Sequence, residues 1–184
     1  WEALESAGLD AQLVSSQYPT TAVVVGGGKA EYGQRAFYLD EPYDKHVETG
    51  LHFSAAVGRV SYFLDVHGPC YAVDTACSSA AVAIANGFNL IRYGAAPLVI
   101  TGGVSELCYP TVTINFSKAG MLSADGRCKA FDASANGYVR GDGCGLLIIQ
   151  SSRSRRALGL PRLCVVAAAG VNQDGRSEGL TAPN

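Results

Sequence analysis

The sequence predicts an α/β fold, in which a sheet carries helices on both of its faces. Short runs of consecutive apolar residues alternate along the chain with longer segments of helical character, and glycine or proline separates many of them. Strands that are apolar throughout, without a polar residue at every second position, are typical of sheets buried on both sides. Because the intervening helices would supply that cover, we expect the α/β class.

The elements of the first 75 residues follow this alternation. An amphipathic helix is expected over Trp1–Gly8, with the glycine as its stop signal. The run Thr20–Gly28 predicts a buried strand that ends in a glycine turn, and Ala55–Asp65 predicts a helix. A second strand is expected over Cys70–Thr75, directly after a Gly-Pro breaker.

The rest of the chain repeats the pattern. The stretch Ser78–Tyr93 predicts a helix that Gly94 stops. Three further buried strands are expected over the apolar runs Pro97–Gly103, Cys144–Gln150 and Arg162–Gly170.

The helix over Ser78–Tyr93 is unusual in its composition. No charged residue lies between Asp74 and Arg92, and apolar residues fall on every side of the helix. A helix of this kind is expected to be buried all round. Cys77 therefore lies at a strand-to-helix junction, at the positive end of the dipole of a central helix.

That position suits a nucleophilic cysteine. The thiolate is the reactive form of the side chain, and the N-terminus of a helix favours it. Backbone N–H groups there can hold the oxyanion that forms when sulfur attacks a thioester carbonyl. Burial opposes this effect because it raises the pKa of a thiol, so Cys77 should need a basic partner. On the residues alone, the alternative is a buried cysteine that only packs in the core.

The bulk properties are those of an ordinary soluble globular protein. The 184 residues are 48% hydrophobic and 16% charged, with a net charge of −2 and a mean hydropathy of +0.13, which predicts one domain. The acidic balance gives no reason to expect nucleic acid or an anionic membrane as a partner. The longest apolar run, Leu163–Val171, is far shorter than the roughly 20 residues of a spanning helix. No secretion signal opens the chain, and the missing initiator methionine suggests a piece of a longer polypeptide.

The cysteine pattern favours a reducing, cytoplasmic setting. Six cysteines could form disulfides, but scaffolds of that kind belong to short secreted chains with few core residues. No C-x-x-C pair occurs and only three histidines are present, so a structural zinc site has little support. Most of the cysteines lie in apolar or glycine-rich settings and are expected to pack as small hydrophobic residues.

Several longer strings resemble a known family. The stretch "GPCYAVDTACSSA" (Gly68–Ala80) is similar to the nucleophile segment of β-ketoacyl synthases, specifically those of modular type I polyketide synthases. The strings "FSKAGMLSADGRCKAFDASANGYVRGDGCG" (Phe116–Gly145) and "VNQDGRSEGLTAPN" (Val171–Asn184) resemble later segments of the same domain. The opening helix "WEALESAGLD" also fits, so the resemblance extends over nearly the whole chain.

The resemblance implies a thiolase-like fold, layered α-β-α-β-α, of which the chain holds mostly the amino-terminal half. Residues 1–184 would be a partial ketosynthase domain, with about 1–160 in the amino-terminal portion and about 161–184 opening the carboxy-terminal portion. Cys77 would take an acyl chain as a thioester, with its backbone N–H at the oxyanion. A malonyl-type extender on a carrier protein would then lose carbon dioxide and attack that thioester, in a decarboxylative Claisen condensation. The activity would be that of an acyltransferase of the 3-oxoacyl-[acyl-carrier-protein] synthase type.

The family's two catalytic histidines and its lysine would follow Asn184, beyond this chain. His67 begins a string like the family's H-G-T-G-T pattern but continues differently, and we assign it no catalytic role. His46 and His52 lie in a polar stretch and are expected at the surface or an interface. We therefore expect the 184-residue piece alone to be inactive and poorly soluble.

The resemblance also implies the partners. They are the acyl carrier protein and acyltransferase domains of the same multifunctional synthase, and a second ketosynthase that pairs through Cys70–Thr75 in a homodimer. No metal or cofactor would be bound directly, since substrates arrive on the phosphopantetheine arm of the carrier. No nucleic acid or membrane partner is implied, and the location would be cytoplasmic.

Other interpretations are a fatty acid elongating synthase, a thiolase-type enzyme of acyl-CoA substrates, and a non-catalytic ketosynthase-like scaffold. Cys77 argues against the scaffold, because such subunits carry another residue at the nucleophile position. Two short patterns are set aside. Gly26–Lys29 lacks the first glycine and the final Ser or Thr of a phosphate-binding loop. Asp132–Gly143 begins like a calcium loop but ends without the bidentate glutamate.

Overall fold

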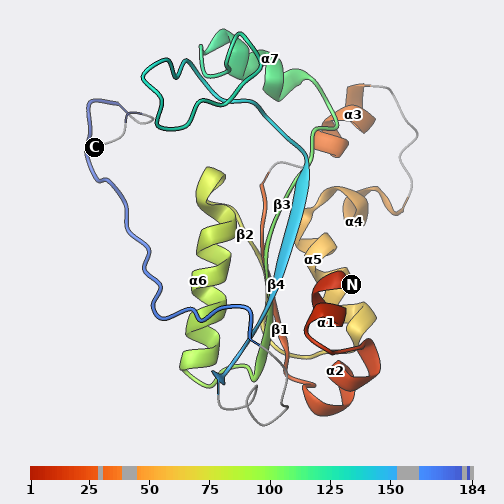
Figure 1. Ribbon diagram of the computed structural model, residues 1–184. Helices are drawn as coiled ribbons and strands as arrows, with labels where there is room; N and C mark the ends of the chain where they lie inside the picture. Colours follow the sequence, from red (N-terminus) through yellow and green to blue (C-terminus); the bar gives the residue numbers. More distant parts are fainter. Residues whose placement is uncertain (29–30, 39–44, 153–161, 180–181, 183–184) are drawn as a thin grey trace.

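The fold has three layers, a four-stranded sheet with helices against each face (Figure 1). The computed structural model describes residues 1–28, 31–38, 45–152, 162–179 and 182. This arrangement confirms the α/β class expected from the alternation of apolar runs and helices.

The sheet has the order β2-β1-β3-β4. Strands β1 (Ala22–Gly26), β2 (Cys70–Val73) and β3 (Leu98–Ser105) are parallel, and β4 (Gly143–Gln150) runs antiparallel to β3. In the register, Val24 lies between Tyr71 of β2 and Thr101 of β3. The central strands β1 and β3 are buried over most of their length, as continuous apolar runs predict.

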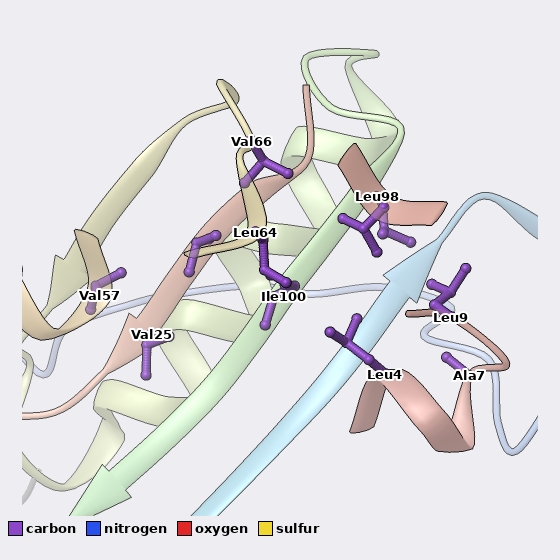
Figure 2. Close-up of a cluster of buried hydrophobic side chains, with 11 residues drawn as sticks. Leu4, Ala7, Leu9, Val25, Val57, Leu64, Val66, Leu98 and Ile100 are labelled. Carbon is purple, nitrogen blue, oxygen red and sulfur yellow. The ribbon is translucent and has the colours of Figure 1, made fainter. Parts of the chain in front are cut away.

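One face of the sheet packs against α1 (Glu2–Ser6), α2 (Ala11–Gln17) and α5 (Phe53–Leu64). The buried side chains between these layers form one apolar cluster, part of which Figure 2 shows: Leu4, Ala7, Leu9, Val14, Val23, Val25, Val57, Leu64, Val66, Leu98 and Ile100. Val23 and Val25 enter this cluster, whereas Val24 between them enters a cluster on the opposite face. This alternation along β1 explains why the strand needs apolar residues at every position.

The other face packs against α6 (Ser79–Arg92), and here one expectation is wrong. Ser79, Ala83, Ala85 and Gly87 of the helix are buried, but Ala80 and Ala81 are exposed and much of the remainder is only half-buried. The helix is covered on the side that faces the sheet, and in the described part of the chain no further layer covers its other side (Figure 1). The charge-free composition of α6 indicates that the helix is suited to burial. It does not indicate which layer of the protein would cover the exposed side.

The helix ends agree with the predicted stop signals. Gly8 and Gly94 follow α1 and α6 and have φ angles of 68° and 72°, in the left-handed region where helices commonly end. Helix α5 begins two residues earlier than expected and ends at Leu64, followed by the cap residue Asp65, a non-glycine residue with φ of 51°. Shorter helices complete the chain: α3 (Glu31–Tyr38), α4 (Val47–Leu51), the 3₁₀ turn η1 (Ala76–Ser78) and α7 (Thr111–Lys118).

Two expected strands differ from their predictions. Strand β4 forms as predicted, but it lies at an edge of the sheet and is half-buried to exposed rather than buried. The run Arg162–Gly170 forms no strand and is exposed along almost its whole length. An apolar run becomes a strand only where a neighbour can pair with its N–H and C=O groups, and no described strand lies beside this segment. Within the described ranges, no helix has the length and apolar composition required to cross a bilayer.

Candidate active site

The carboxyl ends of the three parallel strands lie together at one end of the sheet, here called its carboxyl edge. At this edge the chain enters α3 after β1, η1 and α6 after β2, and the loop to α7 after β3 (Figure 1). The segment from residue 119 to 142, here called the α7–β4 segment, lies at the same end of the molecule. Crevices at the carboxyl ends of parallel strands are the usual place for ligands in open α/β sheets.

Cys77 lies at this edge, in the 3₁₀ turn between β2 and α6. This is the strand-to-helix junction that the sequence predicts. The side chain is exposed, which disagrees with the alternative of a buried packing cysteine. Ala76, directly before it, has φ of 53°, a left-handed conformation that costs a non-glycine residue about 1–2 kcal/mol. Backbone strain of this kind persists only where the surroundings hold it in place.

Side-chain hydrogen bonds hold the junction. The hydroxyl of Ser79 accepts a hydrogen bond from the Thr75 amide at 2.9 Å and donates one to the carbonyl of Ala76 at 2.7 Å. The carboxylate of Asp74 accepts from the Ala76 amide at 3.0 Å, and Ser78 donates to the Thr75 carbonyl at 2.8 Å. These bonds fix both residues that precede Cys77 and the two that follow it.

Two glycines set how closely α6 approaches the sheet. A Cβ atom at Gly26 would lie 2.3 Å from the carbonyl carbon of Ser79, and one at Gly103 would lie 2.6 Å from the Cβ of Ala80. No side chain fits at these distances, so the first turn of α6 rests directly on the backbone of β1 and β3. The close approach of α6 to the sheet therefore acts together with the side-chain hydrogen bonds of the turn to place Cys77.

Tyr138 of the α7–β4 segment is a titratable side chain whose pKa is shifted by its surroundings. Desolvation raises the pKa of Tyr138 above 10.0, the Arg140 guanidinium lowers it, and the negative charge of the Cys77 thiolate raises it. The phenol therefore lies close enough to both groups for their charges to interact.

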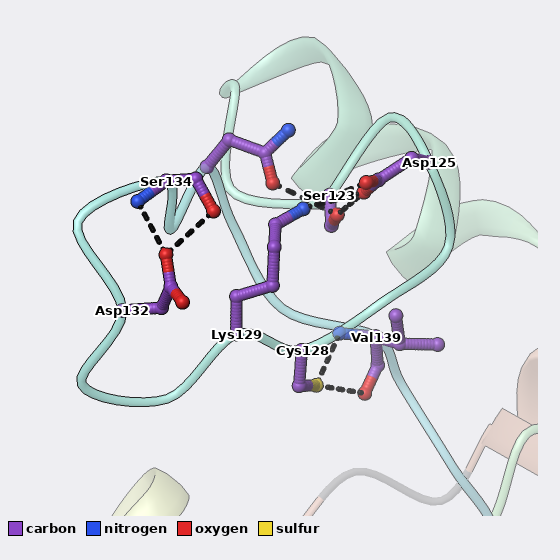
Figure 3. A network of polar contacts seen from close by, with 8 residues as sticks. Ser123, Asp125, Cys128, Lys129, Asp132, Ser134 and Val139 are labelled. Carbon is purple, nitrogen blue, oxygen red and sulfur yellow. Dashed lines mark hydrogen bonds and ion pairs between the residues drawn. The ribbon is translucent and has the colours of Figure 1, made fainter.

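Polar contacts hold the α7–β4 segment in a defined shape (Figure 3). Lys129 and Asp125 form an ion pair at 2.7 Å, which with a hydrogen bond from Ser123 lowers the pKa of Asp125 to about 2. Ser123 also bonds to Asn136, across the segment, at 3.0 Å. The Val139 amide donates to the sulfur of Cys128 at 3.2 Å. The segment is thus ordered although it contains no long helix or strand.

The remaining cysteines do not share the setting of Cys77. All six cysteines lie among the described residues, and all are free and exposed, so the expectation that most of them pack in the core is wrong. Cys108 follows β3, where desolvation and the nearby carboxylates of Glu106, Glu31 and Asp142 raise the pKa of its thiol above 9.0. Negative surroundings disfavour a thiolate, which makes Cys108 a poor candidate nucleophile.

The three histidines lie away from the Cys77 junction in the chain and at the surface. His67 lies in the turn before β2 with an exposed ring 3.9 Å from Asp65, and its amide donates to the Pro19 carbonyl. His46 is exposed, and His52 is exposed with its ring 2.8 Å from Glu48. Among the described residues no group of three or more His, Cys, Asp or Glu side chains could hold a metal ion.

Sequence reasoning missed one part of this edge, the buried pair of Glu31 and Arg140. Glu31 begins α3 and is 2% exposed, and its carboxylate pairs with Arg140 of the α7–β4 segment. The two residues are 109 positions apart, and neither belongs to a pattern that predicts a partner. The available signal was weak: single charged residues in glycine-rich stretches that follow or precede apolar strands.

Comparison with known proteins decides the family. Residues 1–154 match the family described as "Beta-ketoacyl synthase, N-terminal domain". The chain belongs to the β-ketoacyl synthase family. It is 44% identical over 184 residues to the phenolphthiocerol synthesis polyketide synthase type I Pks15/1 of Mycobacterium bovis, and 41% identical to the erythronolide synthase EryA3 of Saccharopolyspora erythraea. Each match covers the whole chain but only 8% and 6% of those synthases.

Solved ketosynthases have the same fold. The oxazolomycin ketosynthase domain OzmH KS7 of Streptomyces albus JA3453 superposes with a TM-score of 0.89 at 31% identity. The ketosynthase from module 6 of the bacillaene synthase of Bacillus subtilis 168 gives 0.82, also at 31% identity. Both comparisons cover all of this chain and about a third of the other, 32% and 31%. The expected thiolase-like fold, represented by its amino-terminal part, is confirmed.

Proposed function

We propose that this chain is the amino-terminal part of a ketosynthase domain that extends acyl chains in polyketide synthesis, with Cys77 as the nucleophile. The observation that carries the proposal is the place of Cys77, exposed at the start of α6 in a turn held by Ser79 and Asp74. Relatives that are polyketide synthases support this function over a fatty acid elongating synthase or a thiolase of acyl-CoA substrates. In this proposal residues 1–160 belong to the amino-terminal portion of the domain and 161–184 open the carboxy-terminal portion. That boundary falls within residues 153–161 and so lies outside the described residues.

The proposed reaction has two stages. The Cys77 thiolate attacks the carbonyl of an acyl thioester, and the thiol of the carrier's phosphopantetheine arm leaves. Main-chain N–H groups at the start of α6, including that of Cys77, stabilise the oxyanion of the tetrahedral intermediate. A carrier-bound malonyl-type extender then loses carbon dioxide, and its carbanion attacks the acyl-Cys77 carbonyl. The C–S bond breaks, which frees Cys77 and leaves a β-ketoacyl thioester two backbone carbons longer.

A basic group must assist this chemistry, and the described histidines do not supply it. His46, His52 and His67 are all exposed and outside the Cys77 junction. We infer that the base and the groups that promote decarboxylation come from later parts of the synthase. The 184-residue chain alone should therefore lack condensing activity.

The partners follow from the same proposal. A carrier protein domain delivers both substrates on its pantetheine arm, and an acyltransferase domain of the same synthase loads the extender. A second ketosynthase pairs through β2, which lies at an edge of the sheet with one side open to a further strand in the described fold. We propose a cytoplasmic location. The six described cysteines form no disulfide, as is usual in a reducing compartment.

The test is acyl transfer to the full-length synthase that carries this sequence. We expect Cys77→Ala to lower the rate of acyl-enzyme formation at least about 1,000-fold, because a nucleophile cannot be replaced by its neighbours. Acyl adducts would be measured by mass spectrometry of the active-site peptide after incubation with an acyl thioester. Cys144→Ser, at an exposed cysteine of β4, is the matched control and should load normally. Unchanged loading of Cys77→Ala would refute the assignment.

A further inference from the structure

The carboxylate of Glu31 is buried at the edge of the sheet where Cys77 lies. It pairs through Oε1 with Nη2 of Arg140, and its Oε2 accepts a hydrogen bond from the Tyr109 amide at 3.3 Å. Glu31 begins α3 after β1, and Tyr109 lies in the loop between β3 and α7. The Glu31 carboxylate thus links the segment that follows β1 to the segment that follows β3.

Arg140 extends this connection to a third and a fourth element. Its side chain is 13% exposed, and its Nη1 donates to the hydroxyl of Thr113 in α7 at 2.6 Å. The guanidinium also lies over the ring of Phe116, 5.8 Å from the centroid. Arg140 itself lies in the α7–β4 segment, two residues after Tyr138. The guanidinium therefore holds α3, α7 and the α7–β4 segment together.

Tyr138 belongs to the same cluster, at the end of the sheet where Cys77 lies. Its ring lies 6.4 Å from that of Phe116, which Arg140 covers. Its main chain is fixed by two hydrogen bonds, from its amide to the Met121 carbonyl at 3.1 Å and to its carbonyl from the Ser123 amide at 2.9 Å. The phenol senses the charges of both Arg140 and Cys77. Because Arg140 lies over Phe116 and Phe116 lies beside Tyr138, any shift of Arg140 would disturb the packing of Tyr138 at the end of the sheet where Cys77 lies.

Stability alone does not explain a buried ion pair here. The desolvation of two charges offsets much of their attraction, so such pairs are weak sources of stability. The α7–β4 segment already has an exposed ion pair between Asp125 and Lys129 that avoids this cost. A guanidinium, by contrast, is planar and donates in fixed directions, which gives a defined geometry rather than a large gain in free energy.

We propose that Glu31 and Arg140 are positioning residues of the ketosynthase site: their buried pair fixes Tyr138 and the α7–β4 segment at the end of the sheet where Cys77 lies, so that an acyl thioester meets the thiol in a reactive orientation. This inference rests on the proposed function. When residues that line an active site are displaced by about 1 Å, the reaction rate can fall roughly 100-fold although the protein remains folded.

The experiment uses the full-length synthase with the paired substitutions Glu31→Gln and Arg140→Met. Removing both charges together avoids the strong destabilisation that follows when one buried charge loses its partner. Two rates would be measured at Cys77 by peptide mass spectrometry, acyl transfer from a carrier-bound acyl thioester and alkylation by iodoacetamide. Alkylation by iodoacetamide, a small reagent, requires an accessible thiol but does not require residues that align a substrate. Glu48→Gln, which breaks an exposed pair with His52 at the end of α4 and lies outside the α7–β4 segment, is the matched control.

We expect the double variant to load acyl chains about 10- to 100-fold more slowly, with the alkylation rate at Cys77 within about threefold of the parent. Glu48→Gln should leave both rates unchanged. Tyr138→Ala should reproduce the loss of loading, and Tyr138→Phe should not. The reason is that the aromatic ring, rather than the hydroxyl, forms this side of the proposed site.

Three results would overturn the inference. Normal loading by the folded double variant would show that the pair positions nothing, although acyl transfer by the parent would leave the proposed function intact. Equal losses of loading and alkylation would indicate a purely structural role. A parent synthase that forms no acyl-Cys77 at all would refute the proposed function itself, and this inference with it.

Discussion

Cys77 owes its place both to the close packing of α6 on the sheet and to the side-chain hydrogen bonds of its turn. Gly26 and Gly103 let the first turn of α6 lie against β1 and β3, and Ser79 is buried where it holds the preceding turn. Substitutions where α6 contacts the sheet are therefore expected to affect both the folding of the domain and the reactivity of Cys77. Gly58, where an added Cβ would meet no atom within 4 Å, lacks this role and is a suitable control.

We predict that Gly26→Ala destabilises the intact ketosynthase domain by about 1–3 kcal/mol. The added methyl group would lie 2.3 Å from a backbone carbon of Ser79, so α6 must move away from the sheet. Equilibrium unfolding in urea would measure the change, and acyl transfer to Cys77 should fall in parallel.

Gly58→Ala is the matched control for that substitution. Gly58 lies inside α5 with nothing within 4 Å of an added Cβ, so alanine should stabilise the helix by about 0.5–1 kcal/mol. Opposite signs for the two variants are expected. A Gly26→Ala domain as stable as its parent would show that α6 does not rest on the sheet backbone.

At the scale of elements, the α7–β4 segment depends on local polar contacts rather than on regular secondary structure. The pair of Lys129 with Asp125 and the bonds from Ser123 close the loop that lies beyond the edge of the sheet (Figure 3). Since the pKa of Asp125 is lowered from 3.8 to about 2, the contribution of this carboxylate to folding is present above about pH 4. It is lost as the pH falls through about 2.

We predict that Lys129→Met raises the pKa of Asp125 toward 3.8, because the ammonium group is the main cause of the lowered value. A residual lowering should remain from the hydrogen bond of Ser123. The measurement is an NMR titration of the Asp125 carboxyl carbon between pH 1.5 and about 6, a window that brackets both values. Lys118→Met, in the last turn of α7, should leave the titration unchanged. An unaltered Asp125 pKa in Lys129→Met would contradict the ion pair.

The sequence predicts which elements exist better than it predicts how they pair. Apolar runs and glycine stops place β1, β2, β3 and α6 within a few residues of their observed bounds, because these signals are local. The antiparallel direction of β4 is not a local property, since it depends on the path of the chain through the α7–β4 segment. The run Arg162–Gly170 has strand composition but no described strand beside it, so the same reasoning fails there.

The candidate site divides in the same way. Cys77 is predictable because a strand, a cysteine and a helix follow one another directly in the sequence. Glu31 and Arg140 are not, because their pairing depends on three strands that bring distant segments to one edge. The exposure of α6 was also beyond prediction, since composition indicates that a face is suited to burial but not which layer covers it.

At the scale of the whole molecule, the described surface carries many large apolar side chains. Tyr62 is 89% exposed, Phe63 69% and Leu163 90%. An open apolar hollow of about 280 Å³ lies between α1, α5 and the β3–β4 side of the sheet, lined mostly by hydrophobic residues that include Leu146 and Ile148. Exposed apolar surface on this scale usually marks a face that another part of a protein covers.

We predict that the 184-residue chain, purified alone, associates into heterogeneous oligomers and binds the dye ANS. The full-length synthase should do neither, because its remaining layers would cover the same surface. Light scattering after size-exclusion chromatography would measure the mass, and carrier-bound substrates would test for condensation, which should be absent. A monodisperse, dye-free chain, or one that elongates acyl groups, would contradict the prediction.

The two bare glycines under α6 have a consequence for protein engineering. Because the backbone of α6 rests on these glycines while Asp74 and Ser79 hold the turn, the proposed nucleophile should keep its place when substrate-selecting side chains elsewhere are exchanged. Pocket linings grafted between synthases should therefore leave the sulfur in register, provided that Gly26 and Gly103 are retained.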